Sequence, residues 1–493
     1  MKKFWIVLIA LGLVAAFSMS ASAADVKFSG SYYIEGWYED NHSLLDKSDA
    51  ATTTQRGPTA LYHQRLRIGT DFKVAEGLML TTRFDAMERN WGDRRERNAN
   101  TNTGSGVTTM GTMEVASRQV STANTGAAQE QANIEWERAF ITANLPFGVL
   151  IAGYAEDIKW GTDFMDTVTT RPLIKLIVPI GNLTLVAAIK KDMEGTMYNG
   201  YGAMNTGDKD IYDLAGVYKW KSGEAGLLFE YLIGNATRSS SVAANASYAT
   251  RIWGLFPYFK QTFGPVYLEA EAFYGAGIMA DFDVAAGSIQ KSLETMGGSI
   301  HAKVDLKPVY FGGRFIYMMG DDPNTRDKQE GTVAAQLVAG QAFLPCLMLF
   351  NDSYYTAMGG GLGGRASFGY SAAASQAGVA AGNAAAFQFM DNVIFFQGYV
   401  GVKPVDKLDI MAAVAYAMAQ KKPNSTGAPG GVDYVSDVYG TEVDVTATYK
   451  IYDNLSYMVG FGYLFTGDYF KGSDPSAKIT NDYILMHKLT LTF

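Results

Sequence analysis

Apolar and polar residues alternate with a period of two through most of this chain. In the first such stretch, Val26, Phe28 and Tyr32 occupy one side, and Lys27 and Glu35 occupy the other. Successive side chains of a β-strand point to opposite faces, so this pattern predicts strands with one apolar face and one polar face. The fold class predicted is therefore all-β.

The alternation recurs in about eighteen segments, each long enough to cross a bilayer as a tilted strand. They lie near residues 26–39, 63–74, 78–89, 134–145, 149–155, 173–180, 183–192, 211–220, 225–233, 250–262, 266–275, 294–305, 309–319, 392–403, 408–419, 438–450, 455–465 and 482–493. Sixteen strands remain an alternative, because 149–155 and 173–180 are short and Pro179 cannot donate to a strand ladder.

The connections between these segments alternate between short and long. Tight turns are expected at 75–77, 146–148, 181–182, 221–223, 263–265, 306–308, 405–407 and 452–454. With an even number of antiparallel strands, all of these turns and both termini fall at one end. Short periplasmic turns and long extracellular loops are typical of an up-and-down transmembrane β-barrel.

The last segment ends without a tail on an aromatic residue. Phe493, Leu491 and Leu489 share one apolar face of this strand. A membrane barrel pairs its last strand with its first and turns such a face toward lipid. We therefore interpret these three residues as a signal for assembly of a transmembrane barrel.

The beginning of the chain predicts export. Lys2 and Lys3 precede an apolar run over 4–17 and small residues up to Ala23, so residues 1–23 are expected to be a signal peptide. Residues 24–493 are then one barrel, with no room before the first strand for a plug domain. The net charge of −8 and the lack of a basic stripe predict no nucleic-acid partner. Cys346 is the single cysteine, and we interpret it as a small buried side chain.

Residues 137–154, ERAFITANLPFGVLIAGY, resemble the porin pattern of an arginine-bearing strand, a Phe-Gly turn and a strand that precedes the third external loop. Three further patches resemble porin-like channel proteins of metal- and sulfate-reducing bacteria: KWGTDF at 159–164, GDDPNTRDKQEG at 320–331 and LFNDSYY at 349–355. Tyr154 stands where many porins carry an arginine, so one charge of the pore wall is missing or moved.

The resemblance implies a passive outer-membrane porin whose third loop folds inward and faces a wall of arginines. Opposed charges across a narrow passage would create a transverse field that sieves small hydrophilic solutes and ions. The alternative is that these are ordinary solvated charges. The candidate constriction residues are Arg65, Arg67, Arg83, Arg138 and Lys175 on the wall, and Glu156, Asp157, Asp163 and Asp166 on the loop. Within its hairpin, Arg67 is expected opposite Asp85.

The long connection over 320–391 exceeds what a linker needs. We expect this external loop to cap or enter the channel and to narrow it. Two further strands inside it are the alternative.

Other functions are weighed against the porin. Enzyme activity is not expected, because His42, His63, His301 and His487 lie in no nucleophile motif or metal-ligand spacing, and no cofactor or metal is predicted. A substrate-selective channel for a sugar or organic acid is the main rival, followed by a structural barrel. Aromatic residues expected to face inward favour this rival: Tyr33, Trp37, Tyr267, Phe273 and Tyr310.

The predicted location is the outer membrane of a Gram-negative cell, reached through the periplasm. Expected partners are membrane lipid, lipopolysaccharide, the barrel-assembly machinery and small hydrophilic solutes. The sequence leaves open the ion selectivity, the preferred solute, and whether the barrel is a homotrimer or a monomer.

Overall fold

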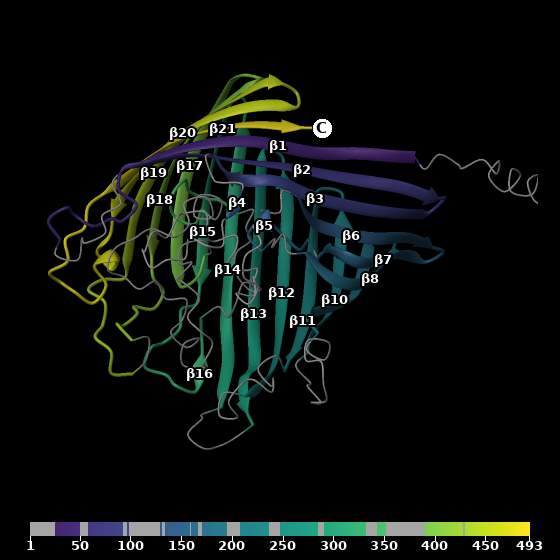
Figure 1. The fold of residues 1–493 in the computed structure, drawn as a ribbon, viewed down its shortest axis with the longest axis horizontal. Coiled ribbons are helices and arrows are strands. Elements are labelled where there is room, and N and C mark those ends of the chain that lie inside the picture. The colour runs from purple at the N-terminus through teal and green to yellow at the C-terminus, as the bar shows by residue number, and fades with distance from the viewer. Residues whose placement is uncertain are drawn as a thin grey trace, which may run out of the picture.

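Eighteen long strands form one continuous wall in the computed structural model (Figure 1). The structure describes residues 25–49, 58–91, 96–97, 129–130, 134–157, 159–165, 170–194, 208–235, 247–283, 290–331, 343–351, 390–426 and 429–493. The predicted signal peptide lies outside these residues and stays a prediction.

The wall strands follow the sequence order around the barrel. Their bounds are β1 Asp25–Glu39, β2 Thr59–Ala75, β3 Leu78–Asn90, β6 Ile134–Leu145, β7 Gly148–Glu156, β8 Thr170–Ile180, β9 Leu183–Met193, β10 Lys209–Trp220, β11 Gly223–Gly234, β12 Tyr248–Phe263, β13 Val266–Phe282, β14 Lys291–Leu306, β15 Val309–Met318, β17 Val393–Val405, β18 Leu408–Met418, β19 Val438–Tyr452, β20 Leu455–Thr466 and β21 Asp482–Thr492.

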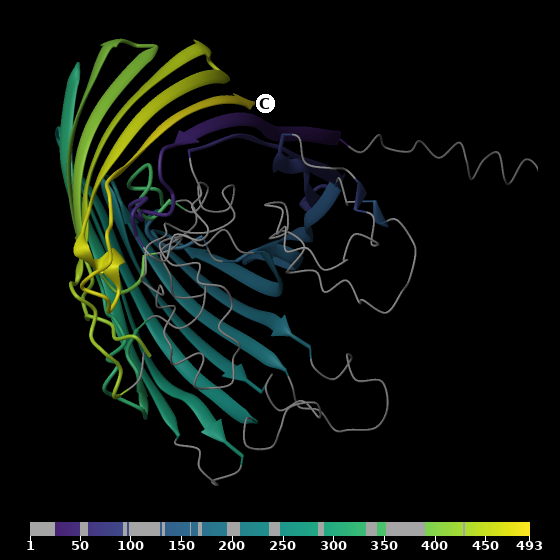
Figure 2. The same cartoon turned by 60° about the vertical axis from the view of Figure 1, so that its left-hand side comes forward.

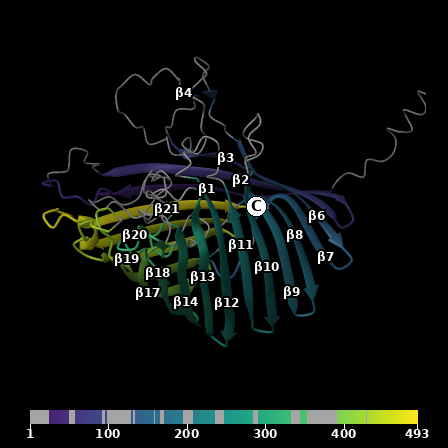
Figure 3. The same ribbon diagram turned by 90° about the horizontal axis from the view of Figure 1, so that it is seen from below.

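The wall closes because the last strand pairs with the first. In the antiparallel pair β1–β21, Ser31 lies opposite Thr492 and Glu39 lies opposite Ile484. At the end of this seam, Gly30 and Phe493 exchange two backbone hydrogen bonds of 2.8 and 3.0 Å. Figures 2 and 3 show the curved wall from two further directions. The predicted antiparallel barrel is confirmed.

The strand number is eighteen rather than sixteen. Both doubtful segments are present as β7 and β8, which pair with each other antiparallel from Val149 opposite Ile177 onward. Pro179 lies beyond that register, so its missing N–H interrupts no pair between β7 and β8. At each of the eight predicted tight turns, two residues separate the paired strands. Because the number of antiparallel wall strands is even, the start of β1 and the end of β21 lie at the same edge of the barrel.

The outer surface of the wall is apolar and the inner surface is mixed. On β10, Leu214 and Tyr212 are 61% and 40% exposed, whereas Asp213 between them is buried. Aromatic residues at three tight turns, Phe147, Phe263 and Tyr452, are also exposed on the barrel edge. This distribution fits a hydrocarbon belt with an aromatic border.

The remaining regular elements are short. They are β4 Glu96–Arg97 paired with β5 Gln129–Glu130, β16 Lys328–Gln329 beside β14, and a single turn of 3-10 helix, η2 Asp468–Lys471. In the described part of the 320–391 connection, β16 is the one strand, and it does not cross the wall. No helix among the described residues is long and apolar enough to cross a membrane.

Leu214→Arg tests the assignment of the outer face, because this residue lies mid-strand on β10. A guanidinium at the bilayer midplane costs about 2–4 kcal/mol of folding free energy in a membrane barrel. We expect a loss of this size in denaturant unfolding from lipid vesicles, with Leu214→Val as the control. Equal stability of the arginine variant and the control would contradict a lipid-facing β10 surface.

Candidate functional site

The predicted wall arginines lie in ion pairs on the inner surface of β2, β3, β6 and β7. Arg67 lies opposite Asp85 and donates to both of its carboxylate oxygens at 2.7 and 2.6 Å, as the hairpin register predicts. Arg65 contacts Glu88 at 3.4 Å. Cross-strand neighbours on one face of a sheet are placed for such contacts. These positive charges are therefore partly neutralised within the wall.

A β-bulge brings an acid into contact with Arg83. Arg83 of β3 lies opposite Arg138 of β6, and the register shifts at the next residue because Glu137 is inserted there. Glu137 contacts Arg83 at 3.6 Å, while Arg138 contacts Glu156 at 2.8 Å. Bulges redirect a side chain in this way. The bulge was not predictable from the alternation, which continues on both sides of it.

Lys190 of β9 is the centre of a second charged group that the sequence analysis missed. Its ammonium is nearly inaccessible and contacts Asp157, Asp213 and Glu230 at 2.9, 2.9 and 2.8 Å. Lys175 donates instead to the backbone carbonyl of Glu156 at 3.1 Å. Glu156 and Asp157, expected on the loop, thus lie beside the cations of the adjacent wall.

The third long connection runs across the inside of the barrel. Trp160 donates through Nε1 to the carbonyl of Phe256 on β12 at 2.8 Å. Thr162 donates to Glu271 of β13 through its backbone N at 2.8 Å and its hydroxyl at 2.6 Å. This connection leaves β7, and β8, β9, β10 and β11 separate that strand from β12 in the wall. Asp166 lies outside the described residues.

Gly161 allows this segment to approach β13. Its φ of +60° is in the left-handed region, and a Cβ built on it would lie 2.1 Å from an oxygen of Glu271. Any side chain here would collide with the carboxylate that holds the segment. The sequence KWGTDF contains this glycine, but its role depends on a strand more than a hundred residues away.

A second segment, residues 343–351 of the 320–391 connection, also lies against the inner wall. Glu442 of β19 accepts hydrogen bonds from the backbone N–H groups of Leu347, Met348 and Leu349 at 3.0, 2.7 and 2.8 Å. Gln397 of β17 donates to the carbonyl of Pro345. Residues 343–351 are therefore inside the barrel, whereas most of this connection lies outside the described residues.

The two inserted segments meet through aromatic side chains. The rings of Phe164 and Phe343 form an edge-to-face contact with centroids 5.6 Å apart. Phe164 is 1% exposed and Phe343 is 8% exposed. Both segments are held to the wall by carboxylates that accept backbone N–H donors, which are strong hydrogen bonds. The two segments therefore contact each other inside the barrel, where they are bound to β12, β13, β17 and β19.

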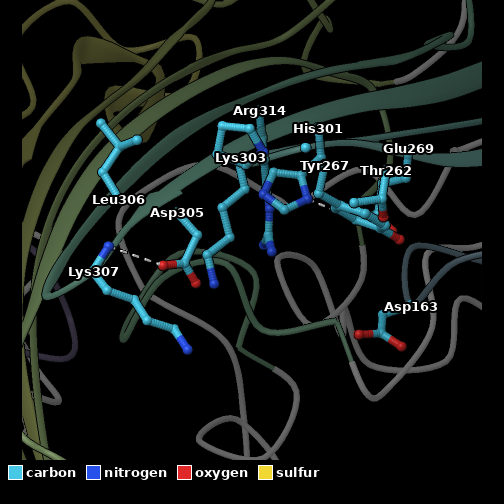
Figure 4. Close-up of a pocket in the computed structure, with 12 residues that line it drawn as sticks. Asp163, Thr262, Tyr267, Glu269, His301, Lys303, Asp305, Leu306, Lys307 and Arg314 are labelled. Carbon is cyan, nitrogen blue, oxygen red and sulfur yellow. Dashed lines mark hydrogen bonds and ion pairs between the residues drawn. The ribbon is translucent and has the colours of Figure 1, made fainter. Parts of the chain in front are cut away.

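A cavity of about 770 Å³ lies between the first segment and the wall. Lys303 and Arg314 come from its β14 and β15 side, and Asp163 comes from the inserted segment (Figure 4). Within the described residues Arg314 forms no ion pair, and its guanidinium lies 5.2 Å from the centre of the Phe343 ring. Lys303 lies 4.5 Å from the centre of the Tyr310 ring. Solutes in this cavity would therefore meet a positively charged side.

The aromatic residues expected to face inward do so, and two of them, Tyr33 and Tyr267, contact charged side chains. Tyr33 lies 4.2 Å from the ammonium of Lys488, and Tyr267 donates through its hydroxyl to Glu269 at 2.8 Å. The others are buried on inner faces: Trp37, Phe273 and Tyr310. Charged side chains such as Lys488 and Glu269 lie beside these rings, so the aromatic residues do not form a continuous track.

The four histidines occupy separate sites. His42 contacts Glu39 at 3.1 Å and His63 contacts Glu35 at 3.4 Å. His301 bridges Glu269 at 2.8 Å and the Tyr399 hydroxyl at 2.7 Å. The fourth, His487, packs among aromatic rings on the outer face.

Cys346 is buried in the second inserted segment. Burial, with the nearby carboxyl groups of Glu442 and Asp444, raises the pKa of its thiol well above the usual range. A neutral, small and buried side chain is what the sequence analysis expects for this position.

Comparisons with solved structures find long but distant matches. OccAB2 of Acinetobacter baumannii is 12% identical over 96% of this chain and 100% of that chain, at a TM-score of 0.49. OccK9 (OpdG) of Pseudomonas aeruginosa is 13% identical over 95% of this chain and 99% of that chain, at a TM-score of 0.48. OmpT, an outer membrane protein of Vibrio cholerae, is 10% identical over 96% of this chain and 99% of that chain, at a TM-score of 0.37.

No protein-family model and no curated protein match the chain. The structural similarities are too low to carry an argument about function. The resemblance to channel proteins of metal- and sulfate-reducing bacteria stays a prediction, as does the role of the constriction residues.

Glu271→Gln tests how the first segment is held in the barrel. The variant replaces charge-assisted hydrogen bonds to Thr162 by neutral ones, and hydrogen bonds to charged groups contribute about 1.5–3 kcal/mol. We expect faster tryptic cleavage after Lys159 by about ten-fold or more. Glu269→Gln, on the same face of β13 but bound to His301, is the control. Unchanged cleavage in Glu271→Gln would show that this carboxylate does not hold the segment.

Proposed function

We propose that this chain is a porin of the Gram-negative outer membrane, through which small hydrophilic solutes and ions diffuse passively. The observation that carries the proposal is a closed barrel with an apolar exterior and charged residues along its inner wall. A barrel of this strand number encloses an aqueous lumen. The polar inner wall lowers the cost of moving a hydrated solute across the membrane, and no catalytic group is required.

The passage is narrowed by the two inserted segments where Phe164 and Phe343 meet. Solutes cross beside this aromatic contact and past the paired charges of the wall, among which Arg67, Arg83 and Arg138 are prominent. Because these arginines have acidic partners, the transverse field is set by local pairs rather than by two fully separated surfaces. The proposed constriction also includes the other residues predicted from the sequence: Arg65, Lys175, Glu156, Asp157, Asp163 and Asp166.

A substrate-selective channel is the second candidate, and the cavity beside Arg314 favours it. The Arg314 guanidinium, which forms no ion pair within the described residues, lines the same cavity as Lys303 and Tyr267 and offers one solute-binding position within the passage. Small conductance steps blocked by one sugar or organic acid would support this candidate, and large unblocked steps would support the general porin.

The proposal also covers the membrane surroundings, the assembly and the oligomeric state of the barrel. Membrane lipid and lipopolysaccharide surround the barrel, the barrel-assembly machinery inserts it by reading Leu489, Leu491 and Phe493, and either a monomer or a homotrimer is compatible with the closed wall. The resemblance of three sequence patches to porin-like channel proteins of metal- and sulfate-reducing bacteria supports the proposal that the chain is related to them.

Phe164→Ala in planar bilayers tests both channel activity and the position of the narrowing. Loss of the ring removes one side of the contact with Phe343, so we expect a larger single-channel conductance than in the wild type. Phe229→Ala, on the exposed outer face of β11, is the control and should leave conductance unchanged. Absence of any conductance steps in the wild type would refute the porin, and an unchanged step in Phe164→Ala would move the narrowing elsewhere.

Ion selectivity in a salt gradient tests the role of Arg138. Arg138→Glu places a second acid beside Glu156 and should move the reversal potential toward cation selectivity. The exchanged pair, Arg138→Glu with Glu156→Arg, restores the net charge and should return the potential close to the wild-type value. A single variant with the wild-type potential would remove Arg138 from the ion path.

A further inference from the structure

A thiol and two carboxylates form a buried cluster between the second inserted segment and β19. Cys346 comes from the segment, and Glu442 and Asp444 come from the inner face of the strand. They are 3%, 0% and 4% exposed. One possible ligand atom from each residue, the sulfur and two carboxylate oxygens, lies within 4.8 Å of the others.

The hydrogen bonds around the cluster leave acceptor positions unused. Glu442 accepts two backbone N–H groups at Oε1, from Leu347 and Met348, but one at Oε2, from Leu349. Asp444 accepts one weak hydrogen bond at Oδ2, from Leu347 at 3.3 Å. Among the described residues, its other oxygen, Oδ1, is buried and accepts no hydrogen bond from an N–H or hydroxyl donor, although the Asp444 carboxyl lies within hydrogen-bonding reach of the Glu442 carboxyl. A buried polar atom without a partner is costly, so this oxygen needs either a proton shared with Glu442 or a ligand.

The two buried carboxylates of the cluster also need a compensating positive charge. In the described part of the chain, no lysine, arginine or histidine forms an ion pair with Glu442 or Asp444, whereas Asp85, Glu156 and Asp213 on the inner wall each have such a partner. Two adjacent buried carboxylates need a positive charge between them, supplied either by a shared proton or by a bound cation. The nearby sulfur is a reason to favour the cation, because a thiol adds nothing to a proton shared by carboxyls.

We propose that Cys346, Glu442 and Asp444 bind a divalent cation of borderline softness, of which Zn²⁺ is the representative. One sulfur and two carboxylate oxygens suit such a cation, and water completes its coordination. Binding replaces the thiol proton, which is released to solvent, and the cation joins the carboxylates of β19 to the inserted segment. The site fastens residues 343–351 to the wall, and it does not depend on whether solutes cross the barrel.

Cobalt is the probe, because thiolate-bound Co²⁺ has a charge-transfer absorption in the near ultraviolet. The full mature chain is refolded into detergent with Co²⁺ present, so that the buried cluster is filled as the segment docks, and unbound metal is removed. We expect one Co²⁺ per folded chain together with this absorption, and displacement of the cobalt by Zn²⁺. Since the chain has a single cysteine, the absorption can be assigned to Cys346.

Variants distinguish Co²⁺ bound at this cluster from Co²⁺ bound adventitiously elsewhere on the protein. Cys346→Ser should abolish the charge-transfer absorption, and Asp444→Asn should weaken Co²⁺ binding by about ten-fold or more, since changes outside the ligand shell already reach this size. Asp409→Asn is the matched control, because its carboxylate accepts a hydrogen bond from Tyr310 elsewhere on the inner wall.

Circular dichroism shows for each variant whether the barrel has formed. A folded wild-type chain that retains no Co²⁺ would overturn the proposal and leave a shared proton between the two acids. Persistence of the absorption in Cys346→Ser would overturn it as well.

Discussion

Closure of the backbone hydrogen-bond ladder is the constraint on which the rest of this molecule depends. A sheet edge exposed to hydrocarbon would leave a row of unpaired N–H and C=O groups, each costing several kcal/mol. The pairing of β1 with β21, completed by Gly30 and Phe493, removes that edge. Once the wall is closed, alternate side chains must face lipid, and the opposite set lines a hydrated interior where charges are tolerated.

Inside this wall, carboxylates organise the polypeptide that enters the lumen. Glu271 and Glu442 each accept backbone N–H groups from an irregular segment that has no strand partner of its own. Such segments can lie at membrane depth only where protein or water satisfies their backbone groups. The same two acids therefore stabilise the segments and determine how close Phe164 and Phe343 come to each other.

The barrel could be predicted from sequence because its rules are local. Period-two alternation and the predicted tight turns located a segment for each of the eighteen strands, with sixteen as the alternative, and the hairpin register placed Arg67 opposite Asp85. The interior was less predictable. Lys190, Glu271 and Glu442 look like ordinary inward-facing charges, and their partners come from other strands or from connections without periodicity. Likewise, no short spacing joins Cys346 to the acids of β19, so a search for metal-ligand motifs in the sequence passes over them.

Gly161 has an evolutionary consequence. Its φ is in the left-handed region and its backbone lies against the Glu271 carboxylate of β13, so a larger residue there would be strained and would have to displace that carboxylate. A duplicated copy of such a gene that acquired alanine or serine at this position would lose part of the contact that holds the segment against the wall.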